Sequence, residues 1–301
     1  MLKSKDMFSK FVYSLFILVF FSASRLLAQH TDSVPDKKSK LTLGIGYSSN
    51  SVFLGRADSI TIPLFNASLT YTLKSGIFFN GSVNYIPSRE TNKLDGGSIG
   101  AGYDFEHNNL SGGLEISKYL SSDNSTLVIA ALSATIGASL SYNIADFITP
   151  TMHAEFALGK SGGGNDIILT PGLTHDFSID HPFSAHDNLS INPGIFLNAG
   201  TQNFYSTYYL RKDKRTLRLK SPKNATTGKK PATATSVNTS KLVLLDYEFI
   251  MPVNYTCGKF GFELTPSYAR AVNTSISSAS QTTSVDKTAV FYVSAGVTFT
   301  F

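Results

Sequence analysis

The sequence is poor in cysteine, tryptophan and charge. Its 301 residues include one cysteine, Cys257, and no tryptophan, and 16% of them are charged. A single cysteine excludes the internal disulfides that staple small secreted domains. The fold must therefore be held together by hydrogen bonds and by burial of apolar surface. Without tryptophan, the aromatic side chains available to the protein are those of tyrosine and phenylalanine.

Long apolar runs are also scarce, and the only one lies near the start of the chain. Residues 11–21 are almost wholly apolar; they follow three lysines and precede small residues that end near Ala28. This layout is typical of a secretory signal peptide, and the run is shorter than the ~20 residues that a membrane-spanning helix needs. We expect residues 1–28 to be removed on export and residues 29–39 to form a periplasmic linker. If the rest of the chain enters a membrane, it must do so as strands.

Apolar residues alternate with small or polar residues along most of the mature chain. A period of two indicates strands with one apolar face, and helical periodicity is hard to find. In the segment 243–253, for example, Leu245, Tyr247 and Phe249 share the apolar face. The alternating segments are 41–47, 65–73, 77–85, 99–105, 110–116, 132–142, 150–158, 167–177, 189–197, 243–253, 260–268 and 289–301.

The same alternation occurs in soluble β-sandwiches, so the direction of the apolar face has to be decided. Three features favour a membrane: the export signal, an even number of strands joined by alternately long and short connections, and a second face of Ser, Thr, Asn and Gly rather than Lys, Glu and Arg. We predict an all-β fold for residues 40–301. It is a transmembrane up-and-down antiparallel β-barrel of about 12 strands, with its apolar register towards lipid and a polar lumen.

The chain ends on its most regular strand, which must pair with the first strand if the barrel is to close. An alternating final strand with Phe291, Phe299 and the terminal Phe301 resembles the signal that the barrel-assembly machinery reads in bacterial outer-membrane β-barrel proteins. With "SVFLGRADSI", "KSGIFFNGSVNYIPS" and "GAGYDF", the chain is similar to uncharacterised barrels of Bacteroidota. The resemblance implies an outer-membrane location, with membrane lipid, lipopolysaccharide and the assembly machinery as partners. It implies no particular activity.

Outer-membrane barrels commonly carry tryptophan in their aromatic girdles, and this chain has none. Tyrosines near the strand ends are the candidates to take that place at the membrane interfaces. They are Tyr71, Tyr85, Tyr103, Tyr142 and Tyr268.

The register opposite the apolar one carries carboxylates. Glu248 and Glu263 lie on neighbouring strands joined by a short turn, so we expect them to approach each other. A water-filled lumen lined by carboxylates favours cations; the alternative is that these charges hydrate the wall or pair across it. The predicted lumen carboxylates are Asp104, Glu115, Glu155, Asp176, Asp246, Glu248 and Glu263.

Positive charge is concentrated in the long outer loop 201–241. The whole chain has a net charge of +5, whereas residues 211–230 alone carry nine basic residues and one acidic residue. This loop can contact the phosphates of lipopolysaccharide, fold into the acidic lumen as a plug or gate, or remain solvated. Its basic residues are Arg211, Lys212, Lys214, Arg215, Arg218, Lys220, Lys223, Lys229 and Lys230.

Catalytic patterns are weak. Outer-membrane phospholipases of twelve strands resemble this architecture, but none of the six histidines is followed two places later by serine. His153 and Glu155 share a face, yet two ligands do not make a metal site. We predict no catalytic residue, metal, cofactor or nucleic-acid partner. The leading hypothesis is a passive porin-like channel for small, cation-preferring solutes. The alternatives are a non-conducting surface protein whose basic loop contacts lipopolysaccharide or a partner, and a lipid-modifying enzyme.

Overall fold

The computed structural model describes most of residues 38–301. The chain divides into two units, Met1–Lys38 and Ser39–Phe301, and all described strands belong to the second. The predicted signal peptide and the basic residues 211–230 lie outside the described residues. Side chains are not described for 275–278 and 281–284. The described ranges are 38–57, 61–90, 93–122, 125, 127–145, 147–160, 164–204, 207–208, 241–272, 275–278, 281–284 and 289–301.

The described residues form strands almost throughout, with one short 3-10 helix and further helical residues at 203–204 and 207–208. No helix among them is long and apolar enough to cross a membrane. The strands are β1 Lys40–Ser48, β2 Val52–Phe53, β3 Arg56–Ala57, β4 Leu64–Thr72, β5 Ile77–Tyr85, β6 Leu94–His107, β7 Leu110–Ser121, β8 Leu132–Tyr142, β9 Thr149–Gly159, β10 Asp166–Thr174, β11 Phe177–Asp180, β12 Asp187–Ile191, β13 Gly194–Gly200, β14 Val243–Ile250, β15 Val253–Cys257, β16 Phe260–Ala271, β17 Ser275–Ser278, β18 Gln281–Ser284 and β19 Ala289–Thr300; the helix is η1 Val128–Ala131.

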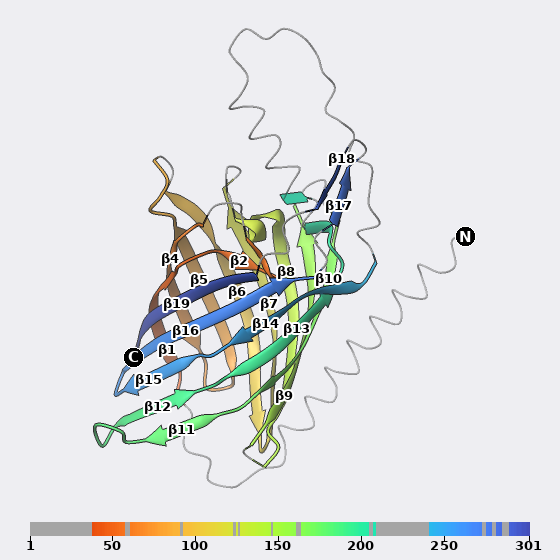
Figure 1. Cartoon of the computed structure of the whole chain (residues 1–301). Coiled ribbons are helices and arrows are strands. Elements are labelled where there is room, and N and C mark those ends of the chain that lie inside the picture. Colours follow the sequence, from red (N-terminus) through yellow and green to blue (C-terminus); the bar gives the residue numbers. More distant parts are fainter. Residues whose placement is uncertain are drawn as a thin grey trace. The chain divides into compact units, whose positions relative to one another are not determined.

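The main sheet closes into an antiparallel barrel of twelve spans (Figure 1). Three spans each consist of two strands in line: β10 with β11, β13 with β12, and β14 with β15. Closure is made by β1 and β19, which pair from Thr42 opposite Thr300 to Ser48 opposite Ser294. Each alternating segment predicted from the sequence coincides with one span. The predicted twelve-strand up-and-down barrel is therefore confirmed, and the last strand is held on both sides, by β1 and by β16.

Prolines lie at two of the three interruptions, and the break between β10 and β11 contains His175 and Asp176 instead. Pro193 lies between β12 and β13, and Pro252 lies between β14 and β15. A proline has no N–H to donate to its neighbour, so regular pairing stops there. The carbonyl groups of Pro193, Pro252 and Pro266 still accept backbone hydrogen bonds from the adjacent spans at 2.9–3.0 Å. Backbone hydrogen bonds between neighbouring spans thus continue across these interruptions.

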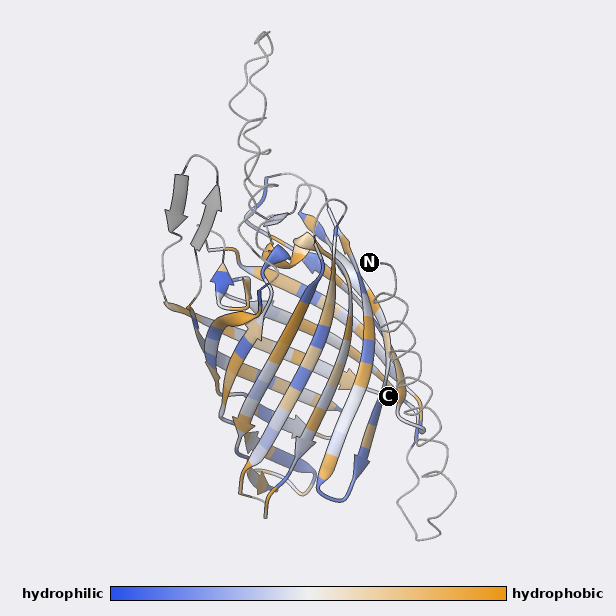
Figure 2. Ribbon diagram, turned by 90° about the vertical axis from the view of Figure 1, so that its right-hand side faces the viewer, coloured by the Kyte–Doolittle hydropathy of each residue, from blue (hydrophilic) through white to orange (hydrophobic). Residues whose placement is uncertain are grey.

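The outer face of the barrel is apolar and the inner face is polar. Leu69, Ile136 and Phe249 on three different spans are 46%, 47% and 44% exposed, and Figure 2 shows the alternation of apolar and polar residues along the ribbons. On the inner face, hydroxyl groups meet across neighbouring strands, as between the Oγ atoms of Ser82 and Ser98 at 2.9 Å. A closed sheet satisfies every backbone hydrogen-bonding group in hydrocarbon, and an exposed apolar belt around it suits contact with lipid. The predicted orientation of the two registers is confirmed.

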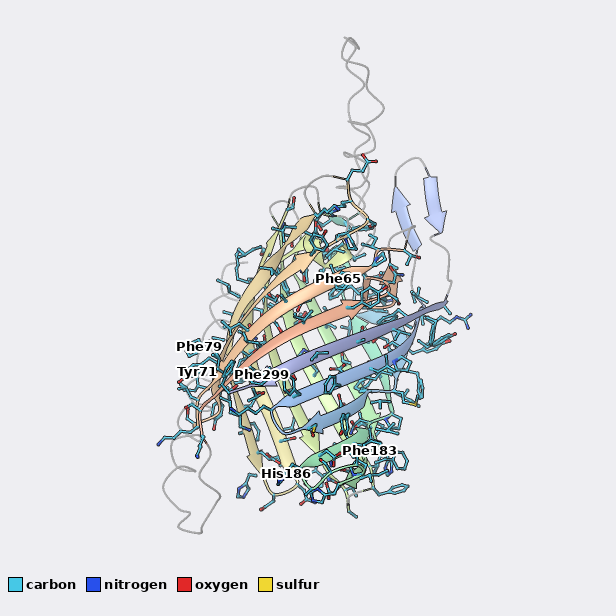
Figure 3. All side chains as sticks on the ribbon, turned by 90° about the vertical axis from the view of Figure 1, so that its left-hand side faces the viewer. Phe65, Tyr71, Phe79, Phe183, His186 and Phe299 are labelled. Atoms are coloured by element: carbon cyan, nitrogen blue, oxygen red, sulfur yellow. The ribbon has the colours of Figure 1, made fainter. Side chains whose placement is uncertain are left out.

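Aromatic side chains lie on the exposed outer face towards both rims. Tyr71 pairs with Phe79 directly across β4 and β5 near the turn rim, and both side chains are exposed. Figure 3 shows these residues with Phe299 at the turn end of the wall. Phenylalanine therefore shares with tyrosine the interfacial positions that tryptophan commonly takes. The five tyrosines named from the sequence, Tyr71, Tyr85, Tyr103, Tyr142 and Tyr268, all have exposed side chains.

A β-bulge near the loop rim overturns one predicted orientation. The register between β13 and β14 shifts between Asn198 and Ala199, which leaves Leu245 as an extra residue in β14. An extra residue moves the side chains beyond it to the other face. Leu245 is consequently buried inside the barrel and Leu244 is exposed. The expectation that Leu245 shares the outer face with Tyr247 and Phe249 was wrong for this reason.

Candidate functional site: the lumen and its loop-side mouth

Apolar side chains fill the loop-side end of the lumen. Inward residues of β8, β9, β10 and β14 pack there against η1 and against a turn that contains Phe204. Ile129 of η1 also packs against a second cluster that reaches towards β4. We call the hairpin Val52–Ala57, η1 and the described residues 203–204 and 207–208 together the mouth plug. The two clusters consist of Val128, Ala131, Leu132, Ala157, Ile168, Phe204, Tyr208 and Leu245, and of Ile62, Ile86, Leu127 and Ala130.

Asp166 fixes the Phe204 turn of the mouth plug. Its carboxylate is buried at the start of β10 and accepts hydrogen bonds from Thr201 Oγ1 at 2.6 Å and from the backbone N–H groups of Asn203 and Phe204, both at 2.7 Å. Such bonds satisfy the first free donors of a helical turn, as an N-cap does. The Phe204 ring is thereby held in the centre of the larger cluster.

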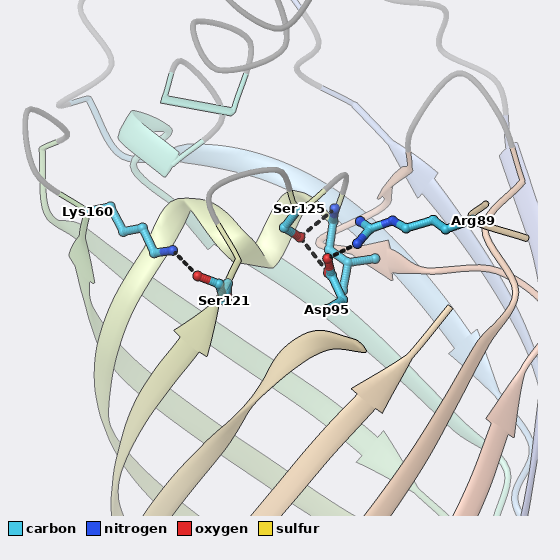
Figure 4. Close-up of polar contacts among 6 residues, drawn as sticks. Arg89, Asp95, Ser121, Ser125 and Lys160 are labelled. Carbon is cyan, nitrogen blue, oxygen red and sulfur yellow. Dashed lines mark hydrogen bonds and ion pairs between the residues drawn. The ribbon is translucent and has the colours of Figure 1, made fainter. Parts of the chain in front are cut away.

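A polar network at the rim fixes η1 (Figure 4). Arg89 forms an ion pair with Asp95 at 2.5 Å, and Ser125 donates a hydrogen bond to the same carboxylate, also at 2.5 Å. The backbone N–H of Leu127 then bonds to Ser125 Oγ at 3.2 Å. Lys160 Nζ donates to the carbonyl of Ser121 at 3.0 Å. These contacts tie the connection before η1 to β6, so η1 is held over the lumen.

The hairpin Val52–Ala57 brings a buried arginine into the mouth. Arg56 donates hydrogen bonds to the Leu54 carbonyl at 2.7 Å and to Gln202 Oε1 at 3.0 Å. Its guanidinium carbon lies 5.8 Å from the centre of the Phe204 ring, within the range of a cation–π contact. The Phe53 ring meets the same ring edge-on at 5.3 Å between centroids. The hairpin and the Phe204 turn therefore form one packed unit.

The strands place six of the seven predicted lumen carboxylates on the inner register, and Asp176 lies between β10 and β11. Asp104, Glu115, Asp176 and Glu263 are exposed, Glu155 and Glu248 are partly buried, and Asp246 is buried. Asp176 accepts a hydrogen bond from Asn192 Nδ2. The seven are Asp104, Glu115, Glu155, Asp176, Asp246, Glu248 and Glu263.

Two of these carboxylates face each other across a glycine. Glu115 on β7 and Glu155 on β9 both pair with Gly137 of β8, and the ring of His153 lies over this glycine. Asn80 Nδ2 donates to Glu115 at 3.2 Å, and His153 Nε2 lies 3.9 Å from Glu155 Oε2. In the described part of the chain, no group of three or more His, Cys, Asp or Glu side chains is placed to hold a metal ion. The pair is suited to attracting mobile cations.

The expected approach of Glu248 to Glu263 does not occur. Glu248 pairs with Ala269, whereas Glu263 pairs with Asn254. Asn254 is six residues beyond Glu248, which corresponds to about 20 Å along a strand. The expectation was wrong because a short turn fixes which residues of a hairpin are opposite each other, and these two are not.

The predicted assembly residues lie on the outer face of the last strand. Phe299 packs against Phe260 and Phe301 at centroid distances of 4.9 and 4.7 Å, and Phe291 and Phe301 are exposed. The Phe301 backbone N–H bonds to the Leu41 carbonyl at 2.9 Å, so pairing with β1 extends to the last residue.

Sequence reasoning missed the mouth plug. Arg56, Asp95, Asp166 and Phe204 stand at strand ends or in connections, where the period-two pattern carries no information. A weak signal was present: Arg56 is a lone cation in the connection 49–63, which otherwise carries one acid, Asp58. The start of the long loop 201–241 thus contributes Phe204 and Tyr208 to the mouth plug, whereas its basic residues 211–230 lie outside the described residues.

No model of a known protein family matches the sequence, and no curated protein is similar to it. Solved structures are similar over most of the chain. The KdgM porin is 8% identical, with 87% of this chain and 99% of that chain covered and a TM-score of 0.45. The NanC porin is 10% identical, with 86% of this chain and 98% of that chain covered and a TM-score of 0.42. An outer membrane channel from Pseudomonas putida F1 is 10% identical, with 91% of this chain and 100% of that chain covered and a TM-score of 0.40. These low scores carry no argument about activity, and the architecture rests on the strand pairing itself.

Proposed function

We propose that the protein is a porin-like outer-membrane channel for small solutes that prefers cations. The observation that carries this proposal is that six of the seven predicted carboxylates, all but Asp176, belong to the inner register of strands in a closed barrel with an exposed apolar outer face. Carboxylates on the wall of a narrow aqueous path raise the local concentration of cations and exclude anions. The exposed group on the turn side, with Asp104, Glu115 and Glu263, forms the entrance in this proposal.

The mouth plug limits conduction in this proposal. Its apolar clusters include fully buried side chains such as Phe204 and Leu245, which pack against each other in the loop-side end of the lumen. Solute passage then requires the hairpin or the Phe204 turn to move. The same packing favours the second candidate, a barrel that does not conduct and serves as a surface or structural protein.

Planar-bilayer recording separates the two candidates. We expect the purified protein to give a current whose reversal potential in a KCl gradient shows cation preference. The double substitution Glu115→Gln and Glu263→Gln should move the reversal potential towards zero, while Glu90→Gln, an exposed acid in the connection between β5 and β6, should leave it unchanged. A protein that inserts but never conducts, even after the plug is weakened, belongs to the second class.

Location and partners are part of the proposal. Export by the segment 1–28, reading of Phe291, Phe299 and Phe301 by the assembly machinery, and contact of the basic loop with lipopolysaccharide are each testable in cells. Deleting Phe301 should reduce the amount of folded barrel in the outer membrane. Deleting 211–230 should reduce binding of purified lipopolysaccharide at low salt, because phosphate contacts of exposed basic residues are screened by salt. Unchanged binding of lipopolysaccharide would indicate that the loop is a solvated segment.

A further inference from the structure

In the described strands, two exposed cations interrupt the apolar outer face of the barrel. Lys118 lies close to the loop-side end of β7, and Arg270 lies next to that of β16. They share the outer register of their strands with the exposed side chains of Ile116 and Tyr268. Among the described strand residues, no other exposed Lys, Arg, Asp or Glu belongs to the outer register. The outer face of the strands is therefore positively charged on the loop side and uncharged on the turn side.

The neighbours of Arg270 orient its side chain without neutralising it. Directly opposite Arg270 are Tyr247 on β14 and Ala289 on β19. Arg270 Nη1 donates a hydrogen bond to the Tyr247 hydroxyl oxygen at 3.3 Å. A guanidinium group has five N–H donors, so others remain available on the exposed side. In the part of the chain that the structure describes, no carboxylate forms an ion pair with Arg270.

A cation at this place suits the headgroup region of a membrane. Lipid-facing cations are costly at the centre of the hydrocarbon and tolerated near its edge, and tyrosine is common at the same depth. The planar fork of a guanidinium matches two oxygens of one phosphate group. Lys118 offers only a compact ammonium on a flexible chain, and it is flanked by Ile99 and Ala134. Arg270 is therefore the better placed of the two cations to bind a phosphate.

We propose that Arg270, positioned by Tyr247, binds a phosphate group of lipid A, the membrane anchor of lipopolysaccharide, at the loop-side edge of the apolar belt. Tyr268 and Phe291 pair next to Arg270 on its turn side and are exposed, so the acyl chains of the same lipid can cover them. This site is separate from the basic residues 211–230. The inference rests on the proposed outer-membrane location, in which the loop side faces outwards, and it requires no conduction.

Titration with purified lipid A, followed by native mass spectrometry, tests the site. The full mature chain is kept in detergent micelles, and the fraction of protein that retains lipid A gives the affinity. Arg270→Gln should weaken binding about tenfold, as expected for the loss of a charge-assisted contact. Arg270→Lys should recover only part of that loss, because an ammonium cannot bind two phosphate oxygens in the same fork. Tyr247→Phe, a second and milder variant, should weaken binding about threefold.

The controls separate the phosphate contact from general attraction of lipid. Dephosphorylated lipid A with the same acyl chains should bind the wild type and Arg270→Gln equally weakly. Lys74→Gln removes an exposed lysine in the tight turn between β4 and β5, at the opposite rim, and should leave the affinity for lipid A unchanged. Heat-modifiable migration in gels shows that each variant is folded. Inorganic phosphate in molar excess should not displace the lipid, and phosphatidylglycerol should bind Arg270→Gln and the wild type alike.

Equal affinities of lipid A for the wild type and for folded Arg270→Gln overturn the proposal. So does an Arg270 dependence that persists with dephosphorylated lipid A, or one that appears with phosphatidylglycerol or free phosphate instead of lipid A. An error in the proposed location would show itself separately, as absence of the protein from the outer-membrane fraction of cells. An error in the proposed channel would show itself as absence of current, whatever lipid is bound.

Discussion

At the scale of single residues, buried polar groups at the loop rim position the apolar ones. Asp95 and Asp166 carry the hydrogen bonds that hold η1 and the Phe204 turn, and each lies at or next to the start of a strand. Buried acceptors of this kind are costly to lose because the donors they satisfy remain buried. The closed mouth therefore depends on a few carboxylates as well as on its apolar clusters.

Asp166→Ala should destabilise the barrel and loosen the mouth plug. The substitution leaves the N–H groups of Asn203 and Phe204 without their acceptor, at a cost of about 2 kcal/mol. Thermal melting by circular dichroism measures the loss. Asp180→Ala is the matched control, because that carboxylate is exposed and accepts a hydrogen bond from Asn188. Equal losses in the two variants would show that Asp166 does not anchor the turn.

Two turn glycines with positive φ angles should respond differently to alanine. At Gly76, at φ +91°, a Cβ would lie 2.1 Å from the Asp104 carbonyl oxygen, whereas at Gly258, at φ +59°, it would meet nothing within 4 Å. Gly258→Ala should cost only the left-handed backbone term, about 1 kcal/mol. Gly76→Ala must in addition displace backbone, so it should lower the yield of folded barrel strongly. Heat-modifiable migration in gels measures that yield, and similar yields would refute the turn geometry.

At the scale of elements, the twelve spans were predictable and the mouth plug was not. Period two is a local property: Leu69 alternates with Ser68 and Thr70 whatever the distant partner is, so each span could be read from its own residues. The predicted orientation of Leu245 was wrong because a bulge depends on how two strands are paired. The positions of the hairpin Val52–Ala57 and the Phe204 turn could not be predicted, because they are set by contacts with strands far away in the sequence.

The packing of the plug predicts a contrast between two phenylalanines. Phe204 is 0% exposed in the mouth plug, and Phe183 is 79% exposed near the turn rim. Phe204→Ala should cost about 3–5 kcal/mol, as for other buried aromatic residues, and should increase the conductance of single channels by removing the centre of the cluster. Phe183→Ala should change neither quantity noticeably. An unaltered conductance in a folded Phe204→Ala barrel would contradict a closing role for the plug.

At the scale of the whole barrel, apolar side chains of the strands point outwards, and polar side chains and carboxylates point inwards. The apolar register, the inner hydroxyl and amide groups and the inner carboxylates follow from closing one sheet on itself. The sequence did not predict which carboxylates are neighbours. The Glu115–Gly137–Glu155 row joins three spans by register, and the separation of Glu248 from Glu263 depends on one turn.

The most direct test of this arrangement is the environment of two neighbouring residues in a lipid bilayer. Nitroxide labels are attached to Glu115→Cys and, separately, to Ile116→Cys, each with Cys257→Ser, and the accessibility of each label to oxygen and to a water-soluble nickel complex is measured by electron paramagnetic resonance in vesicles. A label at position 116 should be relaxed mainly by oxygen, which concentrates in lipid, and a label at 115 mainly by the nickel complex. The reverse result, or two equal environments, would contradict a lipid-facing apolar register around an aqueous lumen.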